Sequence, residues 1–246
     1  MKTLGIIPAR YASTRFPAKA LVDIGGKTML QRVYEQAQKA SLIDEVIIAT
    51  DDQRIYEHTQ TFSGKAEMTA LSHQSGTDRC AEVAARHPEF DLVINIQGDE
   101  PFIDPKQIDK VVKPLKENLE VQISTLAILL QEKAAIFNPN VVKVLFSKQK
   151  KALYFSRSTI PHLRGVDEKD WLEKGTFYKH IGLYGFRRRI LEEVAKLERG
   201  SLEEMEALEQ LRWLENDYTI AVELTDQETI GIDTPEDLEK ALKYLA

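Results

Sequence analysis

The loop after the first predicted strand, residues 4–7, concentrates positive charge. It contains three basic residues: Arg10, Arg15 and Lys19. No acidic residue occurs from position 8 to position 22, although the whole chain has a formal net charge of −6. Open α/β sheets bind their ligands at the carboxyl ends of the strands, where this loop would lie. We therefore expect it to bind a small, highly charged anion such as a nucleoside triphosphate; the alternative is a solvated loop with scattered surface charges.

Two common phosphate-binding motifs do not account for this anion. No G-x-G-x-x-G occurs in the chain, and Gly26-Lys27-Thr28 lacks the glycine that a P-loop requires at the position of Leu21. The anion would therefore be held mainly by the basic side chains. Backbone amides and the hydroxyls of Ser13 and Thr14 would assist them.

Two aspartates follow predicted strands that lie far apart in the sequence. Asp99 comes after the strand 92–96 and next to Gly98, which permits a close approach of backbone. Asp233 comes after a strand predicted at 229–232. A turn would also explain Asp99, and a helix start would explain residues 234–237 but not Asp233. Two carboxylates form a partial site for Mg²⁺, which would offset charge on a phosphate under attack.

Residues 73–79, His-Gln-Ser-Gly-Thr-Asp-Arg, are rich in hydrogen-bonding groups and precede a predicted helix. By themselves they are explained as a helix start with Ser75 or Thr77 as the cap. A capped helix start is compatible with ligand binding, because a helix N-terminus attracts anions and polar groups.

The elements alternate in the first 120 residues. Strands are predicted at 4–7, 45–50 and 92–96, and helices at 29–40, 52–62, 77–86 and 105–118. This alternation is typical of βαβ units and a mainly parallel sheet. Later, extended runs at 121–130, 141–146, 152–155 and 180–186 suggest hairpins or an antiparallel edge. We expect an exposed loop at 165–175, a helix at 202–215, a strand at 229–232 and a last helix from Pro235.

The composition excludes several classes of protein. The chain has 246 residues and 43% hydrophobic residues, enough for a sizeable core, and its pI near 5.5 argues against a general nucleic-acid binder. No apolar run approaches the roughly 20 residues of a membrane span. Cys80 is the single cysteine, which we interpret as a buried small residue in a reducing compartment. We expect a cytoplasmic protein with no signal peptide.

Residues 6–19, Ile-Ile-Pro-Ala-Arg-Tyr-x-Ser-Thr-Arg-Phe-Pro-x-Lys, resemble the opening of the sugar nucleotidyltransferases, and specifically of the CMP-Kdo synthetases (3-deoxy-manno-octulosonate cytidylyltransferases). Segments 75–79, 95–101 and 231–238 are also similar to family motifs, in order along the chain. One departure is Ala18, where the family usually has glycine. Ala18 would restrict the backbone if that position needs a positive φ.

The resemblance implies transfer of the cytidylyl group of CTP to the anomeric hydroxyl of Kdo, an acidic eight-carbon sugar, with release of pyrophosphate. The product would serve lipopolysaccharide biosynthesis, and Mg²⁺ would lie on Asp99 and Asp233. Catalytic roles would fall to Arg10, Lys19 and Asp99. The implied nucleotide contacts are Pro8, Ala9, Arg10, Ser13, Arg15, Lys19, His73, Ser75, Gly76, Thr77, Arg79 and Gln97.

The acceptor sugar would be held by residues of the second half: Arg157, His180, Tyr184, Glu209 and Gln210. Without the resemblance, His180 is more simply a structural histidine, and Glu209 and Gln210 a solvated helix face. Arg157 would pair with the sugar carboxylate, since a guanidinium suits bidentate recognition.

The implied fold is a single three-layer α/β/α, Rossmann-like domain with a small mixed α+β subdomain. Residues 1–125 and 215–246 would bind the nucleotide and metal, and residues 126–214 would bind the sugar and form a homodimer. Two alternatives remain open. The acceptor could be another acidic sugar, such as a sialic acid or an amino-substituted Kdo, or the chain could be a nucleotide-binding regulatory module without turnover. Lys19, Asp99 and Asp233 argue against the second.

Overall fold

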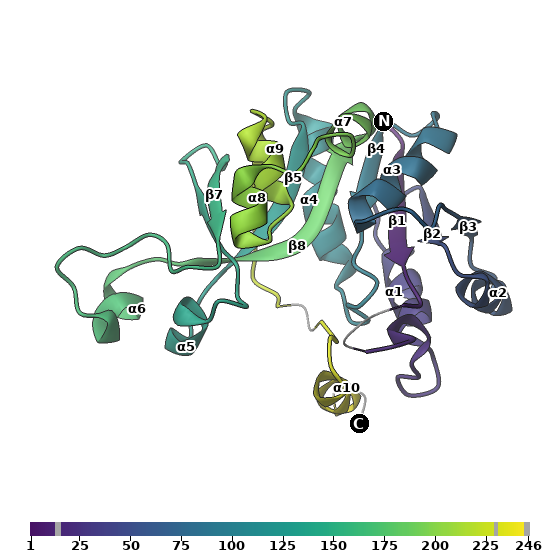
Figure 1. Ribbon diagram of the computed structural model, residues 1–246, viewed down its shortest axis with the longest axis horizontal. Coiled ribbons are helices and arrows are strands. Elements are labelled where there is room, and N and C mark those ends of the chain that lie inside the picture. Colours follow the sequence, from purple (N-terminus) through teal and green to yellow (C-terminus); the bar gives the residue numbers. More distant parts are fainter. Residues whose placement is uncertain (13–15, 229–230, 244–246) are drawn as a thin grey trace.

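A central β-sheet organises the molecule (Figure 1). The computed structural model describes residues 1–12, 16–228 and 231–243. The strand order is β3-β2-β1-β4-β8-β5-β9, with bounds β1 Thr3–Ala9, β2 Glu45–Thr50, β3 Ala66–Met68, β4 Leu92–Asn95, β5 Ile123–Leu129, β8 Tyr178–Arg187 and β9 Ile220–Thr225. Neighbours are parallel except β8, which runs antiparallel to both β4 and β5. The mainly parallel sheet is confirmed.

Helices cover both faces of this sheet. Helices α3 (Gly76–Arg86) and α7 (Arg188–Val194) pack on one face, and α1 (Met29–Ala37) and α4 (Pro105–Glu117) on the other. Successive side chains of a strand point to opposite faces, so Ile6 joins the core under α3 and Ile7 the core under α1. The expected three-layer α/β/α arrangement is confirmed. In the described part of the chain, no helix is long and apolar enough to cross a membrane.

A smaller unit extends from one side of the sheet (Figure 1). It comprises the hairpin β6 (Lys143–Phe146) and β7 (Ala152–Ser156) and the short helices α5 (Lys133–Phe137) and α6 (Trp171–Lys174). Its helices surround a small core of Leu130, Ile136, Trp171 and Phe177, while Val144 and Phe155 of the hairpin pack in the core of the main sheet. The expectation of an exposed loop at 165–175 is therefore wrong in part, because Trp171 is 4% exposed and stacks on Phe177. The assignment of residues 126–214 to the sugar and to dimerisation stays a prediction.

Two further predictions need correction. The helix predicted at 202–215 is two helices, α8 (Ser201–Glu206) and α9 (Gln210–Glu215), since Ala207 between them has a φ of 49°. A strand was expected at 229–232, but Gly231 and Ile232 are not in a strand, while Thr229 and Ile230 lie outside the described residues. The last described strand is β9, which the sequence pattern did not reveal. Helix α10 (Pro235–Leu242) begins as expected, capped by Thr234.

The close packing of β8 on α4 makes Gly185 a stability determinant. A Cβ at this position would lie 2.7 Å from Ser124 Oγ and 2.8 Å from the side chains of Leu115 and Val111. We expect Gly185→Ala to lower the free energy of unfolding by about 1–3 kcal/mol through overpacking. Gly182→Ala on the same strand is the matched control, because nothing lies within 4 Å of its Cβ. Urea denaturation that gives equal effects for the two variants would contradict this packing argument.

Candidate active site

One cation joins the two predicted metal-binding aspartates. Lys19 Nζ donates to Asp99 Oδ2 at 2.8 Å and to Asp233 Oδ1 at 2.9 Å. The Lys19 side chain is 16% exposed, so these charges interact in a partly dehydrated place. Burial by itself would lower the pKa of the Lys19 ammonium, but the two carboxylates outweigh it and raise the pKa above its ordinary value. The carboxylates of Asp99 and Asp233 thus converge on one cation.

The fold brings these three residues together from distant parts of the sequence. Lys19 begins a short 3-10 helix after β1, Asp99 follows β4, and Asp233 lies just before α10. The Ile232 N–H donates to the Asp99 carbonyl oxygen at 2.9 Å, which fixes the returning C-terminal segment beside β4. Ile232 also packs with Met29 of α1 in a small apolar cluster. This cluster and the backbone hydrogen bond place Asp233 opposite Asp99.

Two glycines let the surrounding segments approach the end of β1. A Cβ on Gly98 would lie 3.1 Å from the Pro8 carbonyl oxygen, and a Cβ on Gly76 would lie 3.1 Å from Pro8 Cγ. The expectation that Gly98 permits close backbone contact is confirmed. Pro8 therefore lies against the segment after β4 and the first residue of α3, at the edge of the sheet where a ligand would bind.

Arg10 is held by the segment that precedes α3. Its Nη2 donates to the His73 carbonyl oxygen at 2.8 Å, and the His73 ring is bonded to Glu82 of α3. Glu82 also accepts the Ala70 N–H at 2.9 Å, so this segment is anchored to the helix at two points. The structure brings Arg10 and His73 together as the motifs suggested. Ser13 and Arg15 lie outside the described residues.

The start of α3 links the predicted nucleotide and sugar segments. Ser75 caps the helix and forms a capping box with Asp78, as expected for a helix start. Thr77 Oγ1 donates to Glu209 Oε2 at 2.6 Å. Burial raises the pKa of the Glu209 carboxyl, although hydrogen bonds from Thr77 and Ser75 act in the opposite direction. Glu209 therefore faces α3 and does not lie on a solvated helix face.

Arg79 of α3 points away from the end of β1 where the other predicted nucleotide contacts lie. Its side chain is completely buried, donates to Asp51 Oδ2 at 2.7 Å and bonds the Thr69 hydroxyl. It has no exposed surface with which to contact a nucleotide. The prediction of a nucleotide contact is therefore corrected to a supporting role: Arg79 ties α3 to the end of β2. Asp51, which sequence reasoning missed, follows a strand just as Asp99 does, but its carboxylate is used by this ion pair.

The predicted sugar-binding residues lie around β8. Gln97, predicted as a nucleotide contact, also reaches this strand, since its Nε2 donates to the Gly182 carbonyl oxygen at 3.0 Å and joins the end of β4 to β8. His180 is 9% exposed, lies 2.9 Å from Thr125 Oγ1 and contacts the rings of Phe155 and Tyr184. Burial lowers the pKa of His180 to about 3, so the ring is neutral near pH 7. Tyr184 and Gln210 are also buried.

Arg157 follows β7 and is fixed by backbone carbonyl oxygens. Its guanidinium donates to Glu206 O at 2.7 Å, to Pro139 O at 3.1 Å and to Ala207 O at 3.3 Å. The acceptors on residues 206 and 207 stand at the break between α8 and α9, where helical carbonyl groups lack partners. The break that the sequence did not predict is thus the place where Arg157 is bound.

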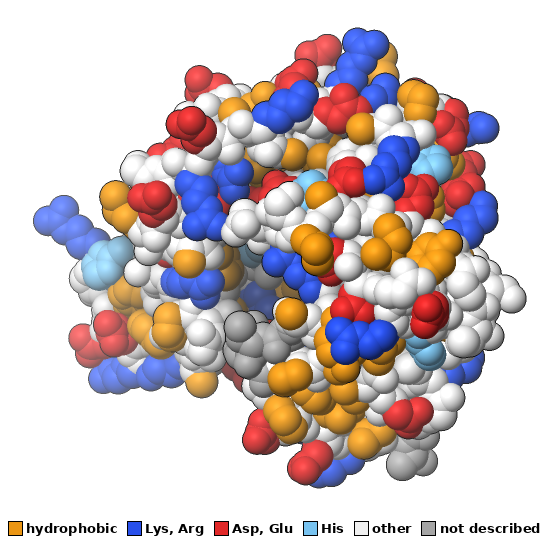
Figure 2. Space-filling model, turned by 45° about the vertical axis from the view of Figure 1, so that its right-hand side comes forward, with side chains coloured by type: hydrophobic (Ala, Val, Ile, Leu, Met, Phe, Trp, Pro, Cys, Tyr) orange, Lys and Arg blue, Asp and Glu red, His pale blue; other side chains and the backbone are white. Residues whose placement is uncertain are grey.

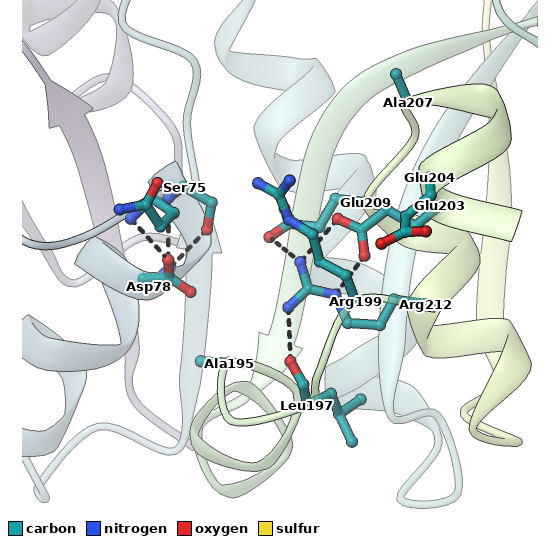
Figure 3. A pocket seen from close by; sticks show the side chains of 11 residues that line it. Ser75, Asp78, Ala195, Leu197, Arg199, Glu203, Glu204, Ala207, Glu209 and Arg212 are labelled. Carbon is teal, nitrogen blue, oxygen red and sulfur yellow. Dashed lines mark hydrogen bonds and ion pairs between the residues drawn. The ribbon is translucent and has the colours of Figure 1, made fainter. Parts of the chain in front are cut away.

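A pocket of about 560 Å³ opens beside these groups (Figure 3). Ser75 and Asp78 of α3 lie on one side of it, and Glu209 and Arg212 on the other. Arg212 is buried in an ion pair with Glu203, at 2.6 Å from its Nε to Oε2. Sequence reasoning missed Arg212 and Glu203, because no motif marks them. Figure 2 shows a hollow in the middle of one face, with basic side chains inside it.

The fold and the charged groups at this edge of the sheet are those of a nucleotidyltransferase, and known proteins of similar sequence belong to this class. The family model described as cytidylyltransferase matches residues 4–224, so the chain belongs to the cytidylyltransferase family. Two relatives are the 3-deoxy-manno-octulosonate cytidylyltransferases of Parabacteroides distasonis and Bacteroides thetaiotaomicron. They are 52% and 53% identical to this chain, over 100% of it and over 99% and 98% of their own lengths.

Solved structures show the same fold. The structure of CMP:2-keto-3-deoxy-manno-octonic acid synthetase complexed with CTP matches with a TM-score of 0.93 and 39% identity, over 100% of this chain and 98% of that one. A 4-diphosphocytidyl-2C-methyl-D-erythritol synthase from Anaerococcus prevotii, at 16% identity and a TM-score of 0.65, shares the fold alone; the match covers 99% of this chain and 98% of that one.

The buried, neutral His180 predicts a loss of stability in acid. Below its ordinary pKa of 6.5 the unfolded chain binds a proton that the folded chain does not bind until about pH 3, so stability falls as the pH falls. From about pH 7 to about pH 5 this proton costs the wild type about 2 kcal/mol in the free energy of unfolding, and His180→Gln should not show this part of the decrease. Urea unfolding of both proteins at the two pH values measures it. An identical pH dependence would show that His180 titrates normally in the fold.

The departure at Ala18 also has a measurable consequence. Ala18 has a φ of 57° and a ψ of 20°, the left-handed conformation that the family's glycine adopts without strain. Ala18→Gly relieves about 1–2 kcal/mol of strain and adds about 0.4–1 kcal/mol of unfolded-state entropy. We therefore expect a small rise in the free energy of unfolding, and a clear fall for Ala18→Val. A fall for the glycine variant in the same denaturation experiment would contradict the strain.

Proposed function

We propose that this protein transfers the cytidylyl group of CTP to Kdo. The anomeric oxygen of Kdo forms a bond to the α-phosphorus of CTP, the bond from that phosphorus to the bridging oxygen breaks, and pyrophosphate leaves. The observation that carries the proposal is the convergence of Lys19, Asp99 and Asp233 at the end of β1 and β4. Full-length relatives at about half identity carry the name of this activity, and its product serves lipopolysaccharide biosynthesis.

We further propose that Asp99 and Asp233 bind Mg²⁺. The residues fit such an ion, because their oxygens converge within 2.9 Å of one cation, here the Lys19 ammonium. Mg²⁺ commonly takes one or two carboxylates and completes its shell with water and phosphate oxygens. When bound, Mg²⁺ would offset charge on the phosphate under attack and lower the pKa of the attacking hydroxyl.

Arg10 and Lys19 supply the positive charge for the triphosphate. Catalysis of this kind is mainly positioning and electrostatic stabilisation, since the transferring group carries its own reactive bond. Arg10 keeps a fixed position through His73, whose own ring is held by α3. Lys19 is held against Asp99 and Asp233, so it is ready to change partners when another cation binds these carboxylates. We assign it to the leaving pyrophosphate.

Arg157 is assigned to the carboxylate of the acceptor. A guanidinium has five N–H donors, and three of those of Arg157 are used by backbone carbonyl oxygens. Among the described residues, one N–H on each terminal nitrogen has no acceptor, and such a pair suits a bidentate carboxylate. His180, Tyr184, Glu209 and Gln210 would contact the sugar hydroxyls. Another acidic sugar remains the competing acceptor, and a panel of such sugars would separate the two.

The proposal also includes an oligomeric state and a cellular location. We propose a homodimer, on the strength of the family resemblance, and a cytoplasmic location, since the chain has one cysteine and would use CTP. Light scattering coupled to size-exclusion chromatography tests the first. A mass of about 28 kDa, that of the single chain, would contradict it.

The test of function is pyrophosphate release from CTP, Mg²⁺ and Kdo. We expect release that requires Kdo, and a fall of about 100-fold or more in kcat/KM for Asp99→Asn, because several kcal/mol of charge stabilisation are lost. Asp226→Asn is the matched control, since Asp226 is exposed and paired only with Lys110 among the described residues. Nucleotide binding without turnover on any acidic sugar would overturn the proposal in favour of a regulatory module. Release that does not depend on Kdo would overturn the assignment of Kdo as acceptor.

A further inference from the structure

Lys143 on β6 is a fully buried lysine that the proposed reaction does not use. Its side chain is completely buried, yet its ammonium bonds backbone carbonyl oxygens and not a carboxylate of the described residues. The acceptors are Asn138 O at 3.0 Å, Val141 O at 2.6 Å and Arg157 O at 2.5 Å. An ammonium has three donors, so all of them are used. Burial lowers the pKa of this ammonium below its ordinary value.

The three acceptors belong to two segments that meet at Arg157. Asn138 and Val141 flank Pro139 in the connection between α5 and β6, and the third acceptor is the carbonyl group of Arg157 itself. The Pro139 carbonyl oxygen in turn accepts a hydrogen bond from the Arg157 guanidinium at 3.1 Å. Lys143 therefore holds the backbone of Arg157 and also the segment on which its guanidinium rests.

The other side of the Arg157 guanidinium rests on the break between α8 and α9. Glu206 contributes its carbonyl oxygen to the guanidinium, while its carboxylate accepts the Arg157 N–H at 2.8 Å and the Ser156 hydroxyl at 2.6 Å. These contacts fix the end of β7 but not the connection from α5. Only the contacts of Lys143 and of Arg157 Nη1 join that connection to Arg157, among the described residues. The connection is also bonded to β8, where the His180 N–H donates to the Val142 carbonyl oxygen at 2.8 Å, so the ammonium acts on the part of it that faces Arg157.

We propose that Lys143 is the positioning residue that sets Arg157 for the carboxylate of the acceptor sugar. This inference rests on the proposed function. Lys143 touches no substrate in this role. It determines the direction of the two remaining guanidinium N–H groups, on which a bidentate bond depends. The nucleotide is held elsewhere, by Arg10 and Lys19, so the effect of Lys143 should be confined to the acceptor.

The test is a steady-state comparison of wild type, Lys143→Met, Arg157→Ala and the double variant. Methionine keeps the length of the side chain and removes every donor. We expect Lys143→Met to raise KM for Kdo at least 10-fold while KM for CTP changes less than 2-fold, because misplaced donors weaken a charge-assisted pair. In the Arg157→Ala background, Lys143→Met should add less than a 2-fold change, since both act through one contact. Lys148→Met, on an exposed lysine of the same hairpin, is the matched control.

The outcomes separate this inference from the proposed function. Equal rises of KM for Kdo and CTP, or effects of the two substitutions that multiply, would show a merely structural role and overturn the inference. If wild type turns over Kdo and Lys143→Met behaves like it, only the inference fails. If wild type does not use Kdo, the proposed function fails and the inference with it. Thermal melting checks folding, and Lys143→Gln, which keeps two donors, replaces the methionine variant in the same cycle if that variant does not fold.

Discussion

The contact of one ammonium with two carboxylates is the interaction on which the rest of the site depends. Lys19, Asp99 and Asp233 come from three separate parts of the sequence and meet at the end of β1 and β4. Two carboxylates this close would repel one another without a cation between them. The lysine therefore stabilises the approach of the C-terminal segment, and the proposed divalent ion would use the same two carboxylates. Folding and the proposed chemistry use one set of charges.

Close packing around this cluster follows from small residues and capped helices. Gly76 and Gly98 bring two segments against Pro8, and Ser75 caps the N-terminus of α3. Thr77 then donates to Glu209, and Gln97 donates to the Gly182 carbonyl oxygen, so hydrogen bonds join the proposed nucleotide and sugar sides. Arg157 and Lys143 form the corresponding support on the far side. The two halves of the site are thus fixed independently and meet at the start of α3.

Much of this arrangement could be predicted from the sequence. Periodicity identified the strands β1, β2 and β4 and the helices α1, α3 and α4, because these elements are regular and bury one face, but it missed β3 and α7. The aspartates after strands were identifiable from their position. The break at Ala207 was not predicted, because no glycine or proline marks it and its carbonyl groups are bound by Arg157, which is distant in the sequence.

Burial of charged groups was also hidden from the sequence. Arg79 matches a motif, yet it lies in a buried ion pair with Asp51, because motif position does not determine which way a helical side chain points. Lys143 carries no motif, and its three carbonyl partners are set by the path of the chain. Strand β9 was missed, while the C-terminal segment forms no strand at Gly231 and Ile232 and still delivers Asp233.

The most direct test of the central claim is a crystal structure with CTP and Mg²⁺ bound. If the metal and the Lys19 ammonium use the same two carboxylates, the metal will lie between Asp99 and Asp233. Lys19 Nζ will then have moved from them to the triphosphate. Lys19 still bonded to both carboxylates, with the metal bound elsewhere, would contradict it.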